Sequence, residues 1–334
     1  SSDGSEAISA LQLALADIND APTGTVVIDG TATQKDTLTV VDTIADEDGL
    51  GARTYTWYAD GVSFGTGTSV VLSQDEVNKD IQVRATYTDE GGADEEVVSL
   101  TVGPVANVND SPTGAVTISG DAVQGQTLTA SNSLADLDGL GTVSYQWQAD
   151  GEDIAGETSA TLTLGQDQVG SAITVVASYT DGFSYDESVA SDETAAVANV
   201  NDDPTGSVTI TGSKTQGQTL TVSHDLGDLD GLGTVSYQWQ ADGEDIAGET
   251  GTELVLGQDQ VGAAITVVAS YTDGFGASEA VTSDPTSTIA NVNDDPTGSV
   301  TISGTTEQGQ TLEASNTLGD LDGLGTVSYQ WQAN

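Results

Sequence analysis

A period of about 92 residues runs through the chain and constrains its fold more than any other feature. The tryptophans Trp57, Trp147, Trp239 and Trp331 are 90, 92 and 92 residues apart, and residues 136–158 are identical to residues 228–250. Such self-similarity is typical of a tandem array of structural units. We therefore expect a partial unit at residues 1–18, repeats at 19–108, 109–200 and 201–292, and the first half of a further repeat at 293–334.

Within a unit, apolar residues alternate with polar ones in short runs bounded by Gly, Asp, Asn and Ser. A period of two predicts β-strands, and about seven short strands per unit favour two packed antiparallel sheets. We expect the tryptophan on the third strand and a tyrosine on the sixth, packed across the core as in immunoglobulin-like domains. The inward positions expected in the second repeat are Val143, Tyr145, Trp147, Ile173, Val175, Ala177 and Tyr179.

Charge and composition narrow the range of functions. The chain has 53 acidic residues, 5 basic residues and one histidine, so its formal net charge is −48. Nucleic-acid binding requires clustered cations and is therefore excluded. With no cysteine and only His224, disulfides, thiolate metal sites and a recurring histidine-based triad are excluded as well. We therefore expect that the chain is not an enzyme.

The ends of the sequence lead to further expectations. No run of 18 apolar residues is present, so we expect no direct membrane insertion by this segment. The start lacks a Met and a signal peptide, and we expect an internal stretch of a longer exported chain. Residues 1–18 are expected to form the last strand of a preceding repeat, although their apolar residues also fit a helix. The fourth unit ends at Asn334, so we expect the polypeptide to continue or another chain to supply its missing strands.

Three acidic motifs occur in register along the units. The linker reads DINDAP at 17–22, NVNDSP at 107–112 and NVNDDP at 199–204 and 291–296. A second motif reads DEDGLG at 46–51 and DLDGLG at 136–141, 228–233 and 320–325, and YTD ends at Asp89, Asp181 and Asp273. In an antiparallel sandwich, the linker, the loop after the second strand and the loop after the sixth strand share one pole. We therefore expect their oxygens to gather near each domain junction.

Carboxylates crowded in this way cannot all stay ionised without a counter-charge, so they must take up protons, stay solvated and apart, or bind cations. Hard oxygen ligands with flexible geometry favour Ca²⁺ over Mg²⁺ or a transition metal. Two alternatives stay open. The DxDG motif is also typical of a turn in which Asp caps and Gly has a positive φ, and the acid could form a solvated halophilic surface without a defined ion. The candidate ligands from the two loop motifs are Asp46, Asp48, Asp89, Asp136, Asp138, Asp181, Asp228, Asp230, Asp273, Asp320 and Asp322.

The linkers resemble the calcium-binding linker of cadherins, although Asn107, Asn199 and Asn291 replace its first Asp and the proline follows one residue sooner. The resemblance implies a further set of calcium ligands from the linkers. They are Asp17, Asn19, Asp20, Asn109, Asp110, Asn201, Asp202, Asn293 and Asp294.

The complete unit, with NVNDxPTG, QGQTL, DLDGLGTVSYQWQADG, QDQVG and SYTDG, is similar to the immunoglobulin-like or cadherin-like extender repeats of giant repeats-in-toxin adhesins. These adhesins are exported by type I secretion to the bacterial cell surface. The resemblance implies an all-β tandem array of β-sandwich domains, with calcium ions and neighbouring repeats as partners. It also implies a calcium-rigidified stalk that projects a distal binding domain for surface attachment or biofilm formation.

Two other functions are compatible with the sequence. The incomplete end units could pair between chains by strand addition, which would give homotypic contacts and an extracellular filament. Alternatively, Phe183, Tyr185 and Phe275 could form an exposed platform for a glycan or another partner. Packing against an edge strand is the favoured interpretation of these aromatics, because the first repeat has Glu90 and Gly91 at this place.

Overall fold

The computed structural model describes residues 18–333, and its regular elements in this range are β-strands and short 3₁₀ turns. The prediction of an all-β chain is therefore confirmed. Asp17, and the expectation of a strand or helix at the start of the chain, lie outside the described residues.

The first repeat contains two antiparallel sheets. One has three strands in the order β1-β2-β5, and the other has four in the order β4-β3-β6-β7. Residues of both sheets contribute to one hydrophobic core, which makes a sandwich. The strands are β1 (Val26–Asp29), β2 (Thr37–Asp42), β3 (Thr54–Ala59), β4 (Val62–Thr66), β5 (Ser69–Val71), β6 (Ile81–Thr88) and β7 (Asp94–Val98), and the turn η1 (Gln74–Glu76) precedes β6.

The second repeat has the same strand order. Its sheets are β12-β9-β8 and β11-β10-β13-β14. The elements are β8 (Val116–Ser119), β9 (Thr127–Asn132), β10 (Ser144–Ala149), β11 (Glu152–Asp153), β12 (Thr161–Thr163), η2 (Gln166–Gln168), β13 (Ile173–Thr180) and β14 (Asp186–Ala190). The expected number of seven strands is therefore confirmed.

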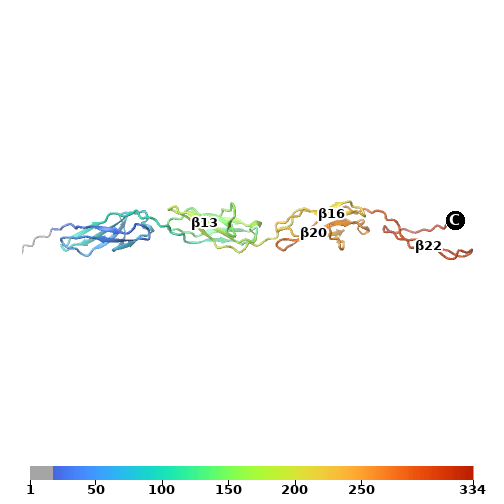
Figure 1. The fold of residues 1–334 in the computed structure, drawn as a ribbon, viewed down its shortest axis with the longest axis horizontal. Helices are drawn as coiled ribbons and strands as arrows, with labels where there is room; N and C mark the ends of the chain where they lie inside the picture. The colour runs from blue at the N-terminus through green and yellow to red at the C-terminus, as the bar shows by residue number, and fades with distance from the viewer. Residues whose placement is uncertain (1–17, 334) are drawn as a thin grey trace, which may run out of the picture. The chain divides into compact units, whose positions relative to one another are not determined.

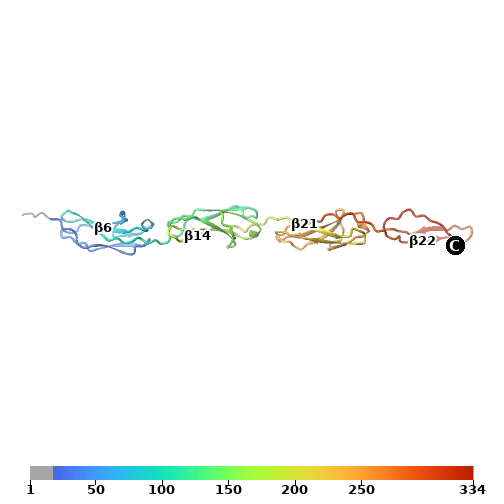
Figure 2. The same cartoon turned by 90° about the horizontal axis from the view of Figure 1, so that it is seen from above.

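The third repeat repeats this order again, with the sheets β15-β16-β19 and β18-β17-β20-β21. Its elements are β15 (Val208–Gly212), β16 (Thr219–His224), β17 (Ser236–Ala241), β18 (Glu244–Asp245), β19 (Glu253–Val255), η3 (Gln258–Gln260), β20 (Ile265–Thr272) and β21 (Ser278–Thr282). Strands β16 and β20 belong to its two sheets (Figure 1). The residues that follow form the hairpin of β22 (Val300–Ser303) and β23 (Glu313–Asn316), where β22 is labelled in Figure 2.

The tryptophans centre the cores as predicted. Trp57, Trp147 and Trp239 lie on the third strand of their repeats and are 0% exposed. Each indole N–H donates to a backbone carbonyl, for example Trp147 Nε1 to Ser159 O at 2.8 Å, so burial leaves no polar group unpaired. The sixth strand shows the alternation expected of a half-buried strand, with Ile173, Val175, Ala177 and Tyr179 buried. Val143 lies just before its strand, and Tyr145 is half-buried.

Trp331 differs from the other tryptophans, because it lies outside any strand and is 50% exposed. In the complete repeats, the third strand pairs with a sixth strand that begins 24 to 26 residues after the tryptophan. Part of the core that buries the tryptophan therefore comes from residues that follow it in each unit.

Proximity of Cα atoms divides the chain into two compact units. The first runs to Gly120 and includes Thr127–Leu162 and Ala172–Ala195, and the second combines Asp121–Gln126, Thr163–Ser171 and the residues from Ala196 onward. Two loops of the second repeat belong to the second unit, and Gln124 and Gln166 in these loops hydrogen bond to Asp202 and Asp230. The repeat boundaries taken from the sequence stay a prediction.

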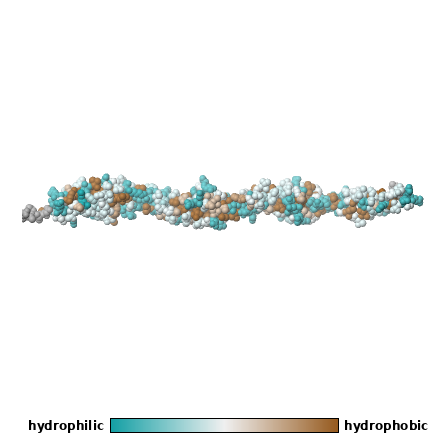
Figure 3. Space-filling model, turned by 90° about the horizontal axis from the view of Figure 1, so that it is seen from below, coloured by the Kyte–Doolittle hydropathy of each residue, from teal (hydrophilic) through white to brown (hydrophobic). Residues whose placement is uncertain are grey.

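On the face drawn in Figure 3, apolar residues form small patches separated by polar ones. Within residues 18–333, no helix has the length and apolar character needed to cross a membrane.

Candidate metal centre

Three carboxylates of the second repeat meet at one pole of its sandwich. Oxygens of Asp136, Asp138 and Asp181 all lie within 4.8 Å of one another. Asp138 and Asp181 are only 4% and 7% exposed, so two of the three charges are largely removed from solvent. The topological prediction that the DLDGLG loop and the YTD loop converge is therefore confirmed for this repeat.

The DLDGLG loop is folded by its own residues. Asp136 Oδ1 accepts from the backbone N–H of Asp138 at 2.8 Å, and Gly139 has a φ of +99°. A side chain at Gly141 would place its Cβ 2.0 Å from the carbonyl oxygen of Thr180. The turn function of this motif is thus observed, and the glycines allow the loop to lie against the end of β13.

A buried tyrosine holds the first carboxylate of this loop. The hydroxyl of Tyr179 donates to Asp136 Oδ2 at 2.6 Å. Burial, followed by this hydrogen bond, raises the pKa of Tyr179 well above its ordinary value of 10.0. The equivalent hydrogen bonds in the first and third repeats run from the Tyr87 hydroxyl to Asp46 and from the Tyr271 hydroxyl to Asp228. A core strand therefore orients one acidic side chain in each complete repeat.

Substitution Tyr179→Phe tests this support. We expect the free energy of unfolding to fall by about 1 to 2 kcal/mol at pH 7, because a hydrogen bond to a charged group is lost. A raised tyrosine pKa contributes stability that is present below pH 10 and lost as pH rises through the folded pKa. Urea unfolding at pH 7 and above pH 10 should therefore show that the free energy of unfolding decreases more with rising pH for the parent than for Tyr179→Phe. An equal decrease in the two proteins would contradict this function of Tyr179.

The carboxylate of Asp181 leaves one oxygen without a partner. Its Oδ1 accepts from the backbone N–H groups of Phe183 and Tyr185, both at 2.8 Å. Its Oδ2 is buried and has no hydrogen-bond partner, and the same is true of Asp89 Oδ2 and Asp273 Oδ2. A buried, unpartnered carboxylate oxygen is costly unless a proton or a cation satisfies it.

The linker reaches the same pole through its backbone and one amide. The N–H of Asp110 donates to Asp138 Oδ2 at 2.7 Å, and Asn109 Nδ2 donates to Glu187 Oε1 at 2.6 Å. Asn109 Oδ1 is buried and unpartnered. The Asp110 carboxylate instead accepts from Gln34 Nε2 at 2.6 Å and Lys35 Nζ at 2.7 Å. Both linker residues therefore lie at the junction, but the Asp110 side chain is bonded to the preceding repeat.

The first and third repeats share these hydrogen bonds. Asp20 donates its N–H to Asp48 in the first, and Asp202 donates to Asp230 in the third. Asn19 and Asn201 donate to Glu95 and Glu279. In the first repeat, Asn19, Asp48 and Asp89 line a cavity of about 70 Å³, which leaves room for a small ion or water.

In the fourth unit, Asp294 donates its N–H to Asp322 at 2.8 Å, and the N–H of Asp322 donates to Asp320 at 2.9 Å. Asn293 donates instead to the backbone oxygen of Asp294. Two of the three motifs therefore meet here, and this unit has no YTD segment within the printed sequence.

Sequence reasoning missed two sets of residues at these junctions. Glutamines of one repeat donate to aspartates of the next, as Gln74 Nε2 does to Asp138 Oδ1 at 3.0 Å. The oxygens Gln74 Oε1, Gln166 Oε1 and Gln258 Oε1 are all buried and unpartnered. The signal was a glutamine that recurs in register at the start of the QGQTL and QDQVG motifs, and of the corresponding QKDTL and QDEVN segments of the first repeat. The missed residues are Gln34, Gln74, Gln124, Gln166, Gln216 and Gln258, and the glutamates Glu95, Glu187 and Glu279.

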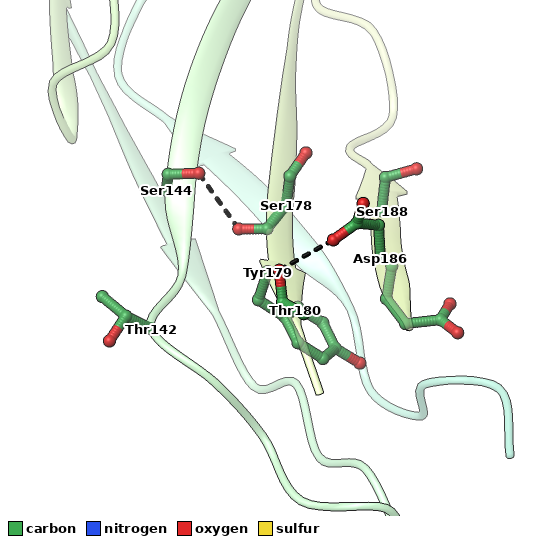
Figure 4. Close-up of a pocket in the computed structure, with 8 residues that line it drawn as sticks. Thr142, Ser144, Ser178, Tyr179, Thr180, Asp186 and Ser188 are labelled. Atoms are coloured by element: carbon green, nitrogen blue, oxygen red, sulfur yellow. Dashed lines mark hydrogen bonds between the residues drawn. The ribbon is translucent and has the colours of Figure 1, made fainter. Parts of the chain in front are cut away.

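The aromatics near the YTD loop have different surroundings. Phe183 is half-buried and packs against the core of the first repeat, whereas Tyr185 and Phe275 are exposed. A neighbouring hollow is lined by hydroxyls and carboxylates of β10, β13 and β14. Figure 4 shows that Thr180 bonds to Asp186 and that the Ser144 hydroxyl donates to the backbone oxygen of Ser178. Phe183 is therefore not part of an exposed platform.

No family model matches this chain, and no curated protein matches it. Several solved structures match. One is a Ca²⁺-stabilized adhesin that helps an Antarctic bacterium to reach out and bind ice, with 17% identity over 86% of this chain and 78% of that chain and a TM-score of 0.31. Another is a tetra-tandem repeat in the extending region of a large adhesion protein, with 16% identity, coverage of 89% and 88%, and a TM-score of 0.29.

A third match is the D1–D4 ectodomain fragment of ICAM-5, with 13% identity, coverage of 76% and 71%, and a TM-score of 0.35. Repeats of large adhesins are thus among the structural neighbours, as the motifs predicted.

Proposed function

We propose that this chain is a calcium-rigidified extender segment of a large bacterial surface adhesin. The observation that carries the proposal is the unpartnered, buried oxygen Asp181 Oδ2 beside the carboxylates of Asp136 and Asp138. Corresponding unpartnered oxygens occur at Asp89 and Asp273. A bound cation would satisfy these oxygens at the same place in each complete repeat.

Electrostatics favours a divalent ion in this cluster. Two unit charges 4.8 Å apart, the largest separation in this cluster, repel by about 3.5 kcal/mol at an effective dielectric constant of 20. Oxygen donors from carboxylates and amides suit Ca²⁺, which accepts six to eight ligands in flexible geometry. The residues that would hold it are Asp136, Asp138 and Asp181, with the amide oxygens of Asn109 and Gln74. Their counterparts would hold it in the other repeats.

This ligand set would join successive repeats. Gln74 belongs to the first repeat, Asn109 to the linker, and the three aspartates to the second repeat. An ion shared among them would restrain the linker from three directions. The close sequence similarity of the second and third repeats, with residues 136–158 identical to 228–250, supports an extender, because a stalk requires length rather than a different binding specificity in each unit.

Small-angle X-ray scattering tests the proposed stiffening. We expect the radius of gyration and maximum dimension to increase when calcium is added to chelated protein, because restrained linkers sample fewer bent arrangements. The control is Mg²⁺ at the same ionic strength, which screens the net charge of −48 equally well. Profiles that are identical in EDTA and in millimolar calcium would contradict the proposed function.

A further inference from the structure

The two described junctions between complete repeats differ in their charge. The first junction is the one at linker 107–112, and the second is the one at linker 199–204. At the first junction, Lys35 Nζ lies 2.7 Å from Asp110 Oδ1, and the Asp110 side chain is only 14% exposed. Among residues 18–333, the ion pairs are Lys35–Asp110, Arg53–Asp42 and Arg84–Glu96, so no cation pairs with Asp202 at the second junction.

Lys35 occupies a position that is glycine in the later repeats. The N–H groups of Lys35, Gly125 and Gly217 donate to the equivalent carbonyls of Leu72, Leu164 and Leu256. Their φ values are +72°, +79° and +79°. A residue with a Cβ is disfavoured in this left-handed region, so lysine is not the residue that the backbone prefers. Its ion pair with the linker is a contact that glycine cannot make.

An apolar contact distinguishes the first junction as well. Phe183 of the second repeat is half-buried and packs against the core of the first repeat. Its counterpart Phe275 is 54% exposed. The first junction therefore has an ammonium group on its linker carboxylate and a partly buried ring, and neither contact has an equivalent in the described part of the second junction.

We propose that the first junction is fastened by Lys35 and Phe183 and stays ordered without calcium, whereas the second junction becomes ordered only when it binds the ion. This inference rests on the proposed function. At the first junction, the Lys35 ammonium group beside the linker supplies part of the positive charge. The second junction must obtain this charge from dissolved Ca²⁺. The charge of Lys35 opposes an incoming Ca²⁺, so the first junction binds calcium more weakly than the second, by roughly threefold to tenfold.

Distance measurements between spin labels can examine each junction in the complete chain. The protein has no cysteine, so two introduced cysteines are its only labelling sites. Thr39, Thr129 and Thr221 are equivalent exposed positions on β2, β9 and β16. The pair Thr39→Cys/Thr129→Cys spans the first junction, and Thr129→Cys/Thr221→Cys spans the second.

We expect the first pair to give a narrow distance distribution in both EDTA and calcium, and the second pair to give a narrow one only in calcium. Lys35→Gln should broaden the first distribution in EDTA, with a roughly threefold fall in the ordered population for the loss of one partly exposed ion pair. Combining it with Phe183→Ala should make the first junction respond to calcium as the second does.

The reciprocal variant is Gly125→Lys. A Cβ at Gly125 meets no atom within 4 Å, so the lysine can be accommodated, and Lys35 shows that this backbone accepts one. We expect it to narrow the second distribution in EDTA, whereas Gly125→Gln, which has the same strain without the charge, should not. Arg84→Gln removes a cation that pairs with Glu96 and packs over Tyr58, and it should leave the first distribution narrow.

The outcomes separate this inference from the proposed function. Equal broadening of both parent distributions in EDTA, followed by equal narrowing in calcium, would overturn the inference and leave calcium stiffening intact. The inference would also be overturned if Gly125→Lys and Gly125→Gln gave the same distance distribution across the second junction. A second distribution that is equally narrow in EDTA and in calcium would overturn the proposed function, and this inference with it.

Discussion

Chelation of calcium from the loaded chain is expected to lower its melting temperature by about 10 to 20 °C. A ligand present at 100 times its dissociation constant stabilises the folded state by about 2.7 kcal/mol. In a domain of about 90 residues, each kcal/mol shifts the melting temperature by about 4 to 8 °C. The buried carboxylates of Asp138 and Asp181 lose their counter-charge on chelation, so the effect should be centred on the acidic poles.

Differential scanning calorimetry in calcium and in EDTA measures this change. Magnesium at the same ionic strength is the matched control, because general screening of 53 acidic residues stabilises the fold without any site. If magnesium restores the melting temperature as fully as calcium does, the acid acts as a solvated surface, and the proposed calcium sites are wrong.

Substitution Asp230→Asn is expected to abolish tight calcium binding at one junction only. Asp230 accepts from Asp202 N and from Gln166 Nε2, so its carboxylate joins the linker, the preceding repeat and the third repeat. Loss of the charge should weaken calcium binding there by about 100-fold. Isothermal titration calorimetry should show a stoichiometry lower by one, with the remaining sites unchanged.

The effect of Asp230→Asn on stability should depend on calcium. In calcium the variant melts below the parent, because it loses the ion. In EDTA the difference from the parent is much smaller, because removal of one of the crowded negative charges offsets the loss of one of the two hydrogen bonds that the Asp230 carboxylate accepts. Asp245→Asn is the control, since Asp245 is exposed on β18 and bonds only to Gln240 in the described contacts. A decrease of the same size in EDTA and in calcium would indicate a structural function for Asp230 rather than an ion ligand.

The sequence left two alternatives to a calcium site open, a capped turn and a solvated acidic surface, and the geometry bears on each of them. The turn interpretation of DLDGLG is observed, since Asp136 caps the loop and Gly139 has a positive φ. It accounts for Asp136 Oδ1 but not for the unpartnered Asp181 Oδ2. A solvated acidic surface accounts for exposed carboxylates, whereas Asp138 and Asp181 are buried. These two buried groups are the reason for preferring a defined ion.

The architecture could be predicted because it depends on patterns between residues that are close in sequence and on their repetition. Alternation of period two identifies strands, and the repeated tryptophan and tyrosine identify the third and sixth of them, without knowledge of any distant contact. The antiparallel order then places the linker, the loop at Asp136–Asp138 and the loop at Asp181 at one pole. Repetition and alternation were therefore sufficient for the fold class, the core aromatics and the convergence of the acidic motifs.

The partners of individual side chains were decided by the tertiary structure. Asp110 was expected to be a calcium ligand, but its carboxylate is bonded to Gln34 and Lys35, which are 76 and 75 residues away in sequence. Gln74 reaches Asp138 across 64 residues, and Glu187 reaches Asn109 across 78. No local pattern encodes which of several nearby groups a flexible carboxylate or amide will meet, because that depends on how two separately folded sandwiches approach along their linker.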